Sequence, residues 1–287
     1  MTRKYVVYGT DTPRCVRDIL KHELHLSANS VKRVKFGGLT VDGNAVTVRH
    51  LLVEGETLTV SFPDEVGSHI RALDIPLDIL FEDDYFLAIN KPTDMPVHPC
   101  RGNHLPTLAE GVMHYLGEDF VFRAVNRLDR DTSGIVLIAK DADSAFRLGE
   151  AFKKGKIKKK YVAITQGVPC PAVGLIDAPI IREREGDMRR VVRADGKPSL
   201  TEYTVLTTYT EQIQGRAQTL ARVRVTPLTG RTHQIRVHLA HIGTPLLYDF
   251  LYGERTEEKT YLLHCESLSF LHPITGQEVH ITAPAPF

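Results

Sequence analysis

Two long stretches in the second half of the chain alternate between apolar and polar residues, and they constrain the fold more than any other feature. The stretches cover residues 200–208 and 219–226, and in the second one Arg224 separates Val223 from Val225. Successive side chains point to opposite faces of a β-strand, so this alternation predicts two strands that each bury one face. The second half of the chain is therefore expected to contain a sheet.

The residues from 77 onward combine further strand patterns with helical ones. Apolar runs at residues 86–89 and 134–139 predict strands, and residues 142–152 have helical spacing. Strands that follow one another as hairpins outnumber alternating strand and helix units. This favours an α+β domain around a largely antiparallel sheet over a parallel doubly wound domain, and we assign it to residues 77–287.

The first 66 residues have the features of a small separate domain. A turn at residues 11–13 precedes apolar residues at helical spacing, and a second short helix is predicted from about residue 27 to Gly37. Asp42-Gly43 predicts the turn of a β-hairpin, and a further strand is expected at residues 57–62. The polar, turn-rich residues that follow are interpreted as a linker, which we place at residues 67–76.

Charge and cysteine content exclude several classes of protein. Lysine and arginine number 36 and aspartate and glutamate 35, so the net charge is +1 and a polyanion could be bound only at a local basic patch. The four cysteines are far apart, which predicts free thiols. A signal peptide and a membrane-length apolar segment are both missing from the sequence, so we expect a cytoplasmic protein without membrane contact, and a monomer.

Common cofactor and metal signatures are not matched. Gly155-Lys156 lacks the rest of a phosphate-binding loop, and the sequence has no Gly-x-Gly-x-x-Gly at the start of a helix. His233, His238 and His241 are close in sequence, but their helical spacing does not bring all three to one point, and packing or phosphate contact explains them better. We therefore expect neither a nucleotide cofactor nor a metal.

The densest cluster of polar residues, 126–134, runs directly into the apolar strand at Ile135. One interpretation is a salt-bridged loop in which Asp129 and Asp131 pair with Arg127 and Arg130. A second is a pair of carboxylates of the glycosidase kind, although the sequence does not determine their separation. Both interpretations stay open on these residues alone.

Two further segments could bind anions. Gly230 and Thr232 resemble a turn and cap before a helix whose first N–H groups, with Arg231 beside them, could hold a phosphate or carboxylate; an ordinary capped helix explains them equally well. Residues 153–160 contain six lysines, which provide a local basic patch, and Tyr161 follows directly after them. The predicted second helix carries Lys32, Arg33 and Lys35, which are either a solvated helix face or a second such patch.

Taken together, these segments resemble the RluA-type pseudouridine synthases. The resemblance spans residues 77–282 and rests on the run around Asp129, the Lys160-Tyr161 step, residues 229–238, Asn90-Lys91-Pro92, Val97-His98-Pro99 and several short motifs between residues 263 and 276. Residues 13–62 similarly resemble the small RNA-binding module of the ribosomal-protein S-four type, an alpha-L motif. The implied fold is a pseudouridine-synthase-like α+β domain around a mixed, largely antiparallel sheet with a central cleft, plus an alpha-L domain.

The resemblance implies a role for particular residues. Asp129 is expected to be the catalytic carboxylate, as a nucleophile or as a base at the ribose 2′ position, with Arg231 holding it ionised and Tyr161 lying against the uracil. Arg127 is expected to take the place of the flipped-out base. Phosphate contacts are expected from Lys158, Lys159 and Lys160 and from Lys32, Arg33 and Lys35.

The implied activity is isomerisation of specific uridines to pseudouridine in structured RNA, without a cofactor. Ribosomal RNA of the large subunit is the expected substrate, with transfer RNA as the other candidate. A non-catalytic RNA-binding or RNA-chaperone protein of the same fold is the alternative, and a nucleosidase is a third interpretation. Three positions depart from the family pattern: Asn126 replaces His, Tyr248 replaces Gly before Asp249, and Cys100-Arg101 follows the His-Pro pair.

Overall fold

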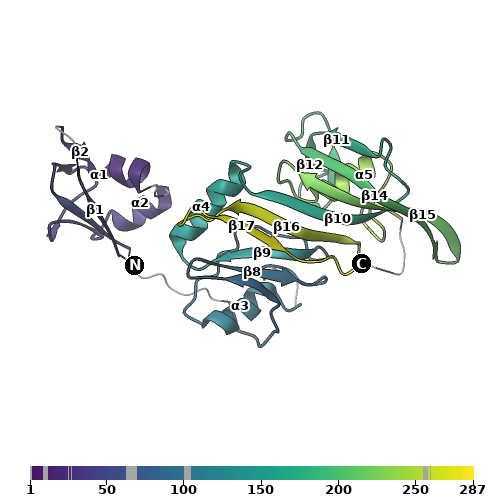
Figure 1. The fold of residues 1–287 in the computed structure, drawn as a ribbon, viewed down its shortest axis with the longest axis horizontal. Helices are drawn as coiled ribbons and strands as arrows, with labels where there is room; N and C mark the ends of the chain where they lie inside the picture. The colour runs from purple at the N-terminus through teal and green to yellow at the C-terminus, as the bar shows by residue number, and fades with distance from the viewer. Residues whose placement is uncertain are drawn as a thin grey trace.

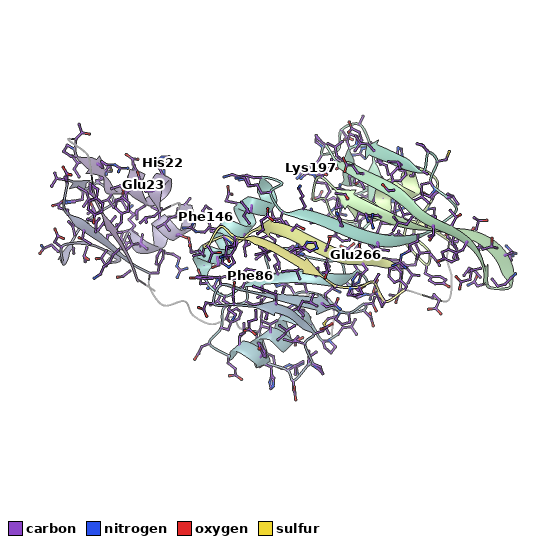
Figure 2. The ribbon with its side chains drawn as sticks, in the orientation of Figure 1. His22, Glu23, Phe86, Phe146, Lys197 and Glu266 are labelled. Atoms are coloured by element: carbon purple, nitrogen blue, oxygen red, sulfur yellow. The ribbon has the colours of Figure 1, made fainter. Side chains whose placement is uncertain are left out.

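The computed structural model describes residues 2–8, 12–24, 26, 28–62, 70–99, 105–254, 258 and 260–287. Two large hydrophobic cores and a third, small cluster of Ile164, Ile213, Leu220 and Leu247 lie in these residues. The smaller core is formed by buried side chains between Val7 and Val60, and the larger by side chains between Phe86 and Ala283. Phe86 is fully buried in the larger core, whereas His22 and Glu23 are exposed on the N-terminal unit (Figure 2).

The N-terminal unit is a small sheet with short helices (Figure 1). Its main sheet has the strand order β1-β6-β3-β4, and β2 pairs with β5. The predicted hairpin is confirmed between β3 and β4, where Asp42 and Gly43 have φ angles of 47° and 87°, the positive values that a tight type I′ turn requires. The elements are β1 (Thr2–Val6), β2 (Arg14–Cys15), α1 (Val16–Asp18), the π-helix η1 (Ile19–Glu23), α2 (Ala28–Val34), β3 (Leu39–Val41), β4 (Asn44–Ala45), β5 (Leu51–Leu52) and β6 (Thr57–Ser61).

Strand β1 is not apparent in the sequence pattern, yet it completes this sheet by antiparallel pairing along the whole of β6. The turn residue Asp11 and the expected helix-start residue Ser27 lie outside the described residues. So does the first part of the predicted linker, up to residue 69. The later linker residues Ile70 and Ala72 pack against the larger core.

The larger unit is built on a nine-stranded sheet with the order β11-β14-β15-β10-β16-β9-β8-β7, with β17 also paired to β16. Every pairing in it is antiparallel except that of β9 with β16, so the expected mixed, largely antiparallel sheet is confirmed. The strands are β7 (Ile79–Glu82), β8 (Phe86–Lys91), β9 (Ser133–Ala139), β10 (Lys158–Gln166), β11 (Val173–Asp177), β14 (Leu200–Ile213), β15 (Arg216–Pro227), β16 (Leu263–Leu271) and β17 (Glu278–Thr282). A separate hairpin joins β12 (Ile180–Arg182) to β13 (Arg190–Val192).

Three helices accompany the sheet: α3 (Leu108–Leu116), α4 (Ala142–Lys153) and α5 (Gln234–His241). The helix expected at residues 142–152 is therefore confirmed as α4, and the Asp141 side chain caps it by accepting N–H bonds from Asp143 and Ser144. Helix α3 starts with a reciprocal capping box between Thr107 and Glu110. Throughout the described residues, each helix is too short or too polar to cross a membrane.

The parallel contact between β9 and β16 is short and very close. It consists of the pairs Ser133 with His264 and Gly134 with Cys265. Gly134 has a φ of 108°, and a Cβ atom added there would lie 2.4 Å from the carbonyl oxygen of Cys265. Only glycine allows the two backbones to approach this closely. This contact brings the loop before β9 next to β10, which is the neighbour of β16 on its other side.

Candidate active site

The loop that carries Asp129 is fixed to the strand that follows it. The Asn126 side chain donates to the carbonyl of Ile135 (3.0 Å) and accepts from the backbone N–H of Leu137 (2.8 Å). The N–H of Thr132 donates to the carbonyl of Asp129 (3.2 Å), closing a turn. Asn126, one of the departures from the family pattern, thus uses its side chain to hold the loop against β9.

A buried lysine holds the same loop from the other side. Lys91 is completely buried, and its Nζ donates to the carbonyls of Pro92, Met95 and Arg130 at 2.8, 2.8 and 2.9 Å. Burial lowers the pKa of Lys91 to about 7, against the opposing effect of nearby carboxylates, with Asp131 the strongest. One side chain therefore ties the end of β8 to the residue after Asp129.

The salt-bridged interpretation of this loop holds for one of its two aspartates. Arg130 makes a two-point contact with Asp131, with Nε–Oδ1 and Nη2–Oδ2 distances of 2.8 and 3.1 Å. Asp129 has different partners and does not pair with Arg127. The two carboxylates therefore have different surroundings, and Asp129 is the one that is available for chemistry.

Three side chains approach Asp129, and all three approach the same carboxylate oxygen. Arg236 Nη1 and Tyr261 Oη each lie 3.5 Å from Oδ2, and His233 Nε2 lies 3.8 Å from it. Within the described part of the chain, no donor contacts Oδ1. The side chain is 31% exposed. Oδ2 thus faces three donor groups, whereas Oδ1 has no such contact among the described residues.

Arg236 is itself held rigidly. Its Nε and Nη2 donate to Asp249 Oδ2 and Oδ1 at 2.7 and 2.8 Å, and Asp249 is fully buried. The guanidinium carbon lies 4.2 Å from the ring centroid of Tyr261 and 5.0 Å from that of Tyr252. Burial alone would lower the pKa of Arg236, but the hydrogen bonds and charge of Asp249 raise it, so Arg236 stays a cation.

The structure corrects the assignment of Arg231 as the partner of Asp129. The Arg231 side chain is exposed, and its Nε donates to the carbonyl of Pro198 (3.3 Å). The helix begins only at Gln234, so residue 231 lies in the preceding loop, whereas Arg236 lies in the first turn of α5 and reaches Asp129. A signal for Arg236 was present: an arginine between Ile235 and Val237 on a short apolar helix is buried and needs a buried acid.

The start of α5, read from the sequence as either an anion site or an ordinary capped helix, has a different geometry from the expected cap. The residue that precedes the helix is His233, in the left-handed conformation with a φ of 57°, and it makes no side-chain cap. The buried Gln234 side chain accepts the backbone N–H of Arg231 (2.9 Å) and donates to the carbonyl of Leu200 (2.8 Å). A protein amide therefore bonds the loop that was one candidate for binding an anion.

Of the three histidines around α5, His238 packs as expected. Its ring is fully buried, with Nδ1 2.8 Å from Thr201 Oγ1 and Nε2 2.9 Å from the carbonyl of Ala178. Both ring nitrogens thus have protein partners. His233 instead lies beside Asp129.

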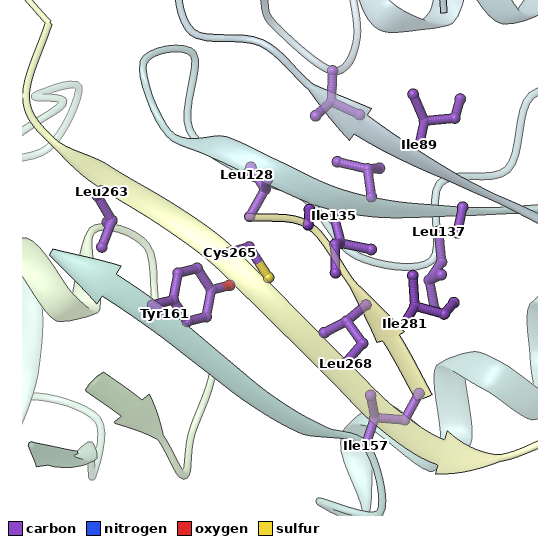
Figure 3. Close-up of a cluster of buried hydrophobic side chains, with 14 of the residues drawn as sticks. Ile89, Leu128, Ile135, Leu137, Ile157, Tyr161, Leu263, Cys265, Leu268 and Ile281 are labelled. Atoms are coloured by element: carbon purple, nitrogen blue, oxygen red, sulfur yellow. The ribbon is translucent and has the colours of Figure 1, made fainter. Parts of the chain in front are cut away.

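Tyr161 lies on β10, and its phenol points toward the Cys265 thiol of β16 (Figure 3). Burial, Cys265 and then Asp129 raise the pKa of Tyr161, so the phenol is protonated at neutral pH. Because the Asp129 charge acts on it, the phenol lies within electrostatic reach of that carboxylate. Tyr261, which the sequence did not identify, lies closer to Asp129.

The lysines directly before Tyr161 do not all lie on one face of β10. Lys159 lies on the same face of β10 as Tyr161 and packs with its Nζ 5.9 Å from the ring centroid of Phe152. Burial lowers the pKa of Lys159, which is only partly exposed, and its expected contact with phosphate stays a prediction. Lys158 and Lys160 are exposed on the opposite face of the strand.

The other expected RNA contacts are at the surface. Arg127 is exposed near His98; burial and then the Arg127 charge lower the pKa of that histidine. In the N-terminal unit, Lys32 and Lys35 are exposed and Arg33 is partly buried. Tyr248 has a φ of 65°, a conformation that favours glycine, in accord with the glycine usual at this position. Cys100-Arg101 lies outside the described residues.

Comparison with known proteins identifies the chemistry to which this arrangement belongs. A family model described as RNA pseudouridylate synthase matches residues 85–241, which include Asp129, Tyr161 and Arg236. The chain belongs to the RNA pseudouridylate synthase family. It is accordingly an RNA pseudouridine synthase, an isomerase.

Relatives of this family match along most of the chain. The sequence is 39% identical over 271 residues to the uncharacterised RNA pseudouridine synthase YjbO of Bacillus subtilis, covering 92% of this chain and 93% of the relative. It is 39% identical over 269 residues to ribosomal large subunit pseudouridine synthase D of Vibrio vulnificus, covering 87% and 80%. A solved structure, human RNA pseudouridylate synthase domain containing 1, is similar with a TM-score of 0.63 and 28% identity, covering 74% and 84%.

Proposed function

We propose that this pseudouridine synthase acts on large-subunit ribosomal RNA, with Asp129 as the reacting carboxylate and Arg236 as its partner. The observation that carries the proposal is the asymmetric environment of Asp129, with one oxygen among three donors and the other open. The substrate class is supported by relatives named ribosomal large subunit pseudouridine synthase D, at 34% to 39% identity.

The reaction breaks the bond between uracil N1 and ribose C1′, turns the uracil and joins its C5 to C1′. The hydrogen at C5 leaves as a proton and N1 gains one, so atoms and electrons balance without an oxidant or a water molecule. Asp129 would act as a nucleophile at C1′ or as a base at C2′. Either role requires an ionised carboxylate with an accessible oxygen, which Oδ1 offers.

Arg236 would keep Asp129 ionised beside the phosphates of RNA. Negative phosphates raise the pKa of a nearby carboxylate, and a fixed cation opposes that effect. Because Asp249 and two tyrosine rings hold the guanidinium, its orientation is set before the substrate arrives. Tyr261 would donate to the same oxygen and add to the stabilisation of the ionised carboxylate.

Tyr161 would lie against the face of the uracil. Its raised pKa keeps the phenol protonated, which favours a packing role over removal of the C5 proton. Arg127 would stack where the uridine leaves the helix, since a planar cation can contact both bases and phosphates.

The N-terminal unit would act as an RNA-binding module of the alpha-L kind, with Lys32, Arg33 and Lys35 as phosphate contacts. Two of these side chains are exposed on the last turn of α2 and beside it. In the catalytic domain, Lys158 and Lys160 would bind RNA on the face of β10 that is opposite to Tyr161. Contacts with phosphate do not depend on the RNA sequence, so they would contribute to the affinity for RNA.

Release of tritium from RNA labelled at uracil C5 tests the proposed function. Wild-type protein should release the label from large-subunit ribosomal RNA, and Asp129→Asn should release none while still binding the RNA. Transfer RNA serves as the second substrate arm, and preference for it would overturn the ribosomal assignment. Binding without release by the wild type on either RNA would favour the non-catalytic alternative, and release of free uracil would favour a nucleosidase.

A further inference from the structure

His233 connects the reacting carboxylate to a tyrosine, and the mechanism above leaves it without a role. Its Nε2 lies 3.8 Å from Asp129 Oδ2, and its Nδ1 lies 2.8 Å from Tyr252 Oη. The two rings meet edge to face at a centroid distance of 5.7 Å. The backbone at His233 is left-handed, with a φ of 57°. Such strain in a non-glycine residue persists where the surroundings hold it, often at a functional site.

The backbone of β13 supports one direction for the hydrogen bond between Tyr252 and His233. The N–H of Arg190 donates to Tyr252 Oη at 2.9 Å, and a backbone N–H can only donate. The tyrosine oxygen therefore accepts from Arg190, which leaves the phenol hydrogen available to donate to His233 Nδ1. A neutral imidazole that accepts at Nδ1 carries its hydrogen at Nε2. That hydrogen is on the nitrogen nearest to Asp129.

The charges around His233 favour this neutral form. Burial lowers the pKa of the imidazole most strongly, and the cations Arg236 of α5 and Arg190 of β13 lower it further. Asp129 and Asp249 act in the opposite direction. The net result is a pKa below the ordinary value, so the ring is neutral at pH 7.

We propose that His233 is a positioning residue that directs the Asp129 carboxylate, with Tyr252 and the N–H of Arg190 fixing its tautomer. As the third donor to Oδ2, after Arg236 and Tyr261, it keeps Oδ1 turned toward the ribose. The distance of 3.8 Å is longer than a hydrogen bond, and such contacts shorten when substrate binds. The inference rests on the proposed role of Asp129.

Two substitutions of His233 separate its donor from its backbone conformation. His233→Gln keeps an N–H at the distance of Nε2, whereas His233→Asn accepts the left-handed backbone but is too short to reach Asp129. In single-turnover tritium release, His233→Asn should be slower by about tenfold, the effect of a lost hydrogen bond to a charged group, with RNA affinity unchanged. His233→Gln should recover most of that rate. His241→Asn, at the exposed end of the same helix, is the matched control and should react like the wild type.

The tautomer of His233 can be measured by NMR spectroscopy, independently of enzymatic activity. In protein labelled with ¹⁵N-histidine, the His233 signals, identified by their loss in His233→Asn, should show a protonated Nε2 and an accepting Nδ1. Tyr252→Phe should shift the Nδ1 signal and slow the reaction, because the ring loses its hydrogen donor. A protonated Nδ1 in the wild type would overturn the inference.

The pH profile supplies a third readout. Protonation of His233 removes its acceptor and places a second cation beside Asp129, which makes that carboxylate less basic. The wild-type rate should therefore fall at pH values below the lowered pKa of His233, and His233→Gln should lack this fall. If Asp129→Asn is inactive but His233→Asn reacts at the wild-type rate, the inference fails and the proposed function stands. No tritium release by the wild type overturns both.

Discussion

At the scale of single residues, the site depends on one guanidinium with two carboxylate partners. Arg236 makes its two short hydrogen bonds to Asp249 and turns its remaining nitrogen toward Asp129. The buried aspartate therefore sets the position of the cation, and the cation sets the electrostatics of the exposed aspartate. A substitution of Asp249 is therefore expected to change the surroundings of Asp129 as well.

Substitution of Arg236 should affect catalysis far more than substitution of Arg231. Arg236→Lys keeps the charge, but a compact ammonium cannot contact Asp249 at two points and Asp129 at once, so the single-turnover rate should fall by about 100-fold. Arg231→Ala removes an exposed side chain and should leave the rate within about twofold. Both variants should be checked by circular dichroism for folding. Equal losses of rate in the two variants would show that Arg231 is as important for the reaction as Arg236.

Lys91 should make stability depend on pH. Because its folded pKa of about 7 is below the ordinary 10.5, the unfolded chain binds a proton that the folded protein does not. The free energy of unfolding should therefore rise with pH between these values, by about 1.4 kcal/mol for each pH unit, and Lys91→Met should lack this contribution. Urea unfolding of both proteins across that range measures it. Parallel curves would show that Lys91 has an ordinary pKa in the folded state.

At the scale of elements, the contact between β9 and β16 positions the loop that carries Asp129. Gly134 lies where the two backbones meet, with backbone atoms of Cys265 within 2.4 to 2.8 Å of an added Cβ. His264 supports the same contact, because its ring bonds Ser133 on β9 (2.8 Å) and the carbonyl of Ala283 (2.9 Å). A side chain at residue 134 would therefore push β9, and Asp129 with it, away from Arg236.

Two glycines with positive φ provide a matched test of that contact. Gly134→Ala should lower the free energy of unfolding by at least about 2 kcal/mol, through strain and steric overlap together, and should abolish most activity. Gly155 has a φ of 67°, and a Cβ atom added there would meet no other atom within 4 Å. Gly155→Ala should therefore lower the free energy of unfolding only by the conformational strain, about 1 kcal/mol. Thermal unfolding compares them. Similar costs for the two variants would mean that the strands can separate without penalty.

At the scale of the whole molecule, the N-terminal unit has a hydrophobic core of its own, separate from the core of the unit that carries Asp129. Buried side chains between Val7 and Val60 form the smaller core, whereas Tyr161 and Tyr261, which lie near Asp129, belong to the larger one. We therefore expect the N-terminal unit to contribute affinity and choice of uridine, and the larger unit to contribute the chemistry.

Removal of two lysines tests this division. Lys32→Ala with Lys35→Ala should weaken RNA binding and reduce the salt dependence of the binding constant by about one unit of slope for each lysine, with the rate at saturating RNA unchanged. Lys21→Ala, an exposed lysine of η1, is the control. Fluorescence anisotropy at several salt concentrations measures the slopes. An unchanged slope in the double variant would exclude these side chains as phosphate contacts.

Local patterns predicted much of this architecture. Alternation in residues 200–208 and 219–226 identified β14 and β15, and Asp42-Gly43 identified a hairpin, because strand faces and tight turns depend on neighbouring residues. β1 and α3 were missed. The pairing of β1 with β6 joins residues more than 50 positions apart, and no local pattern encodes it.

The site was predicted less completely for the same reason. Asp129 could be singled out because a charged loop enters an apolar strand, but its partners come from other elements. Arg236, Tyr261 and His233 become neighbours of Asp129 only through the order of strands in the sheet. The lysine run did not show that Lys159 is less exposed than Lys158 and Lys160, because a run of like residues hides which side chains a strand buries.

The short seam between β9 and β16 has a consequence for how activity can be lost or restored. Asp129 enters from the part of the sheet formed by β7, β8 and β9, whereas Tyr161, Arg236 and Tyr261 all come from beyond it. A chain cut between residues 154 and 156 would divide these groups between two fragments. Neither fragment alone could then isomerise uridine, and recovery of turnover on mixing would report directly that the seam had re-formed.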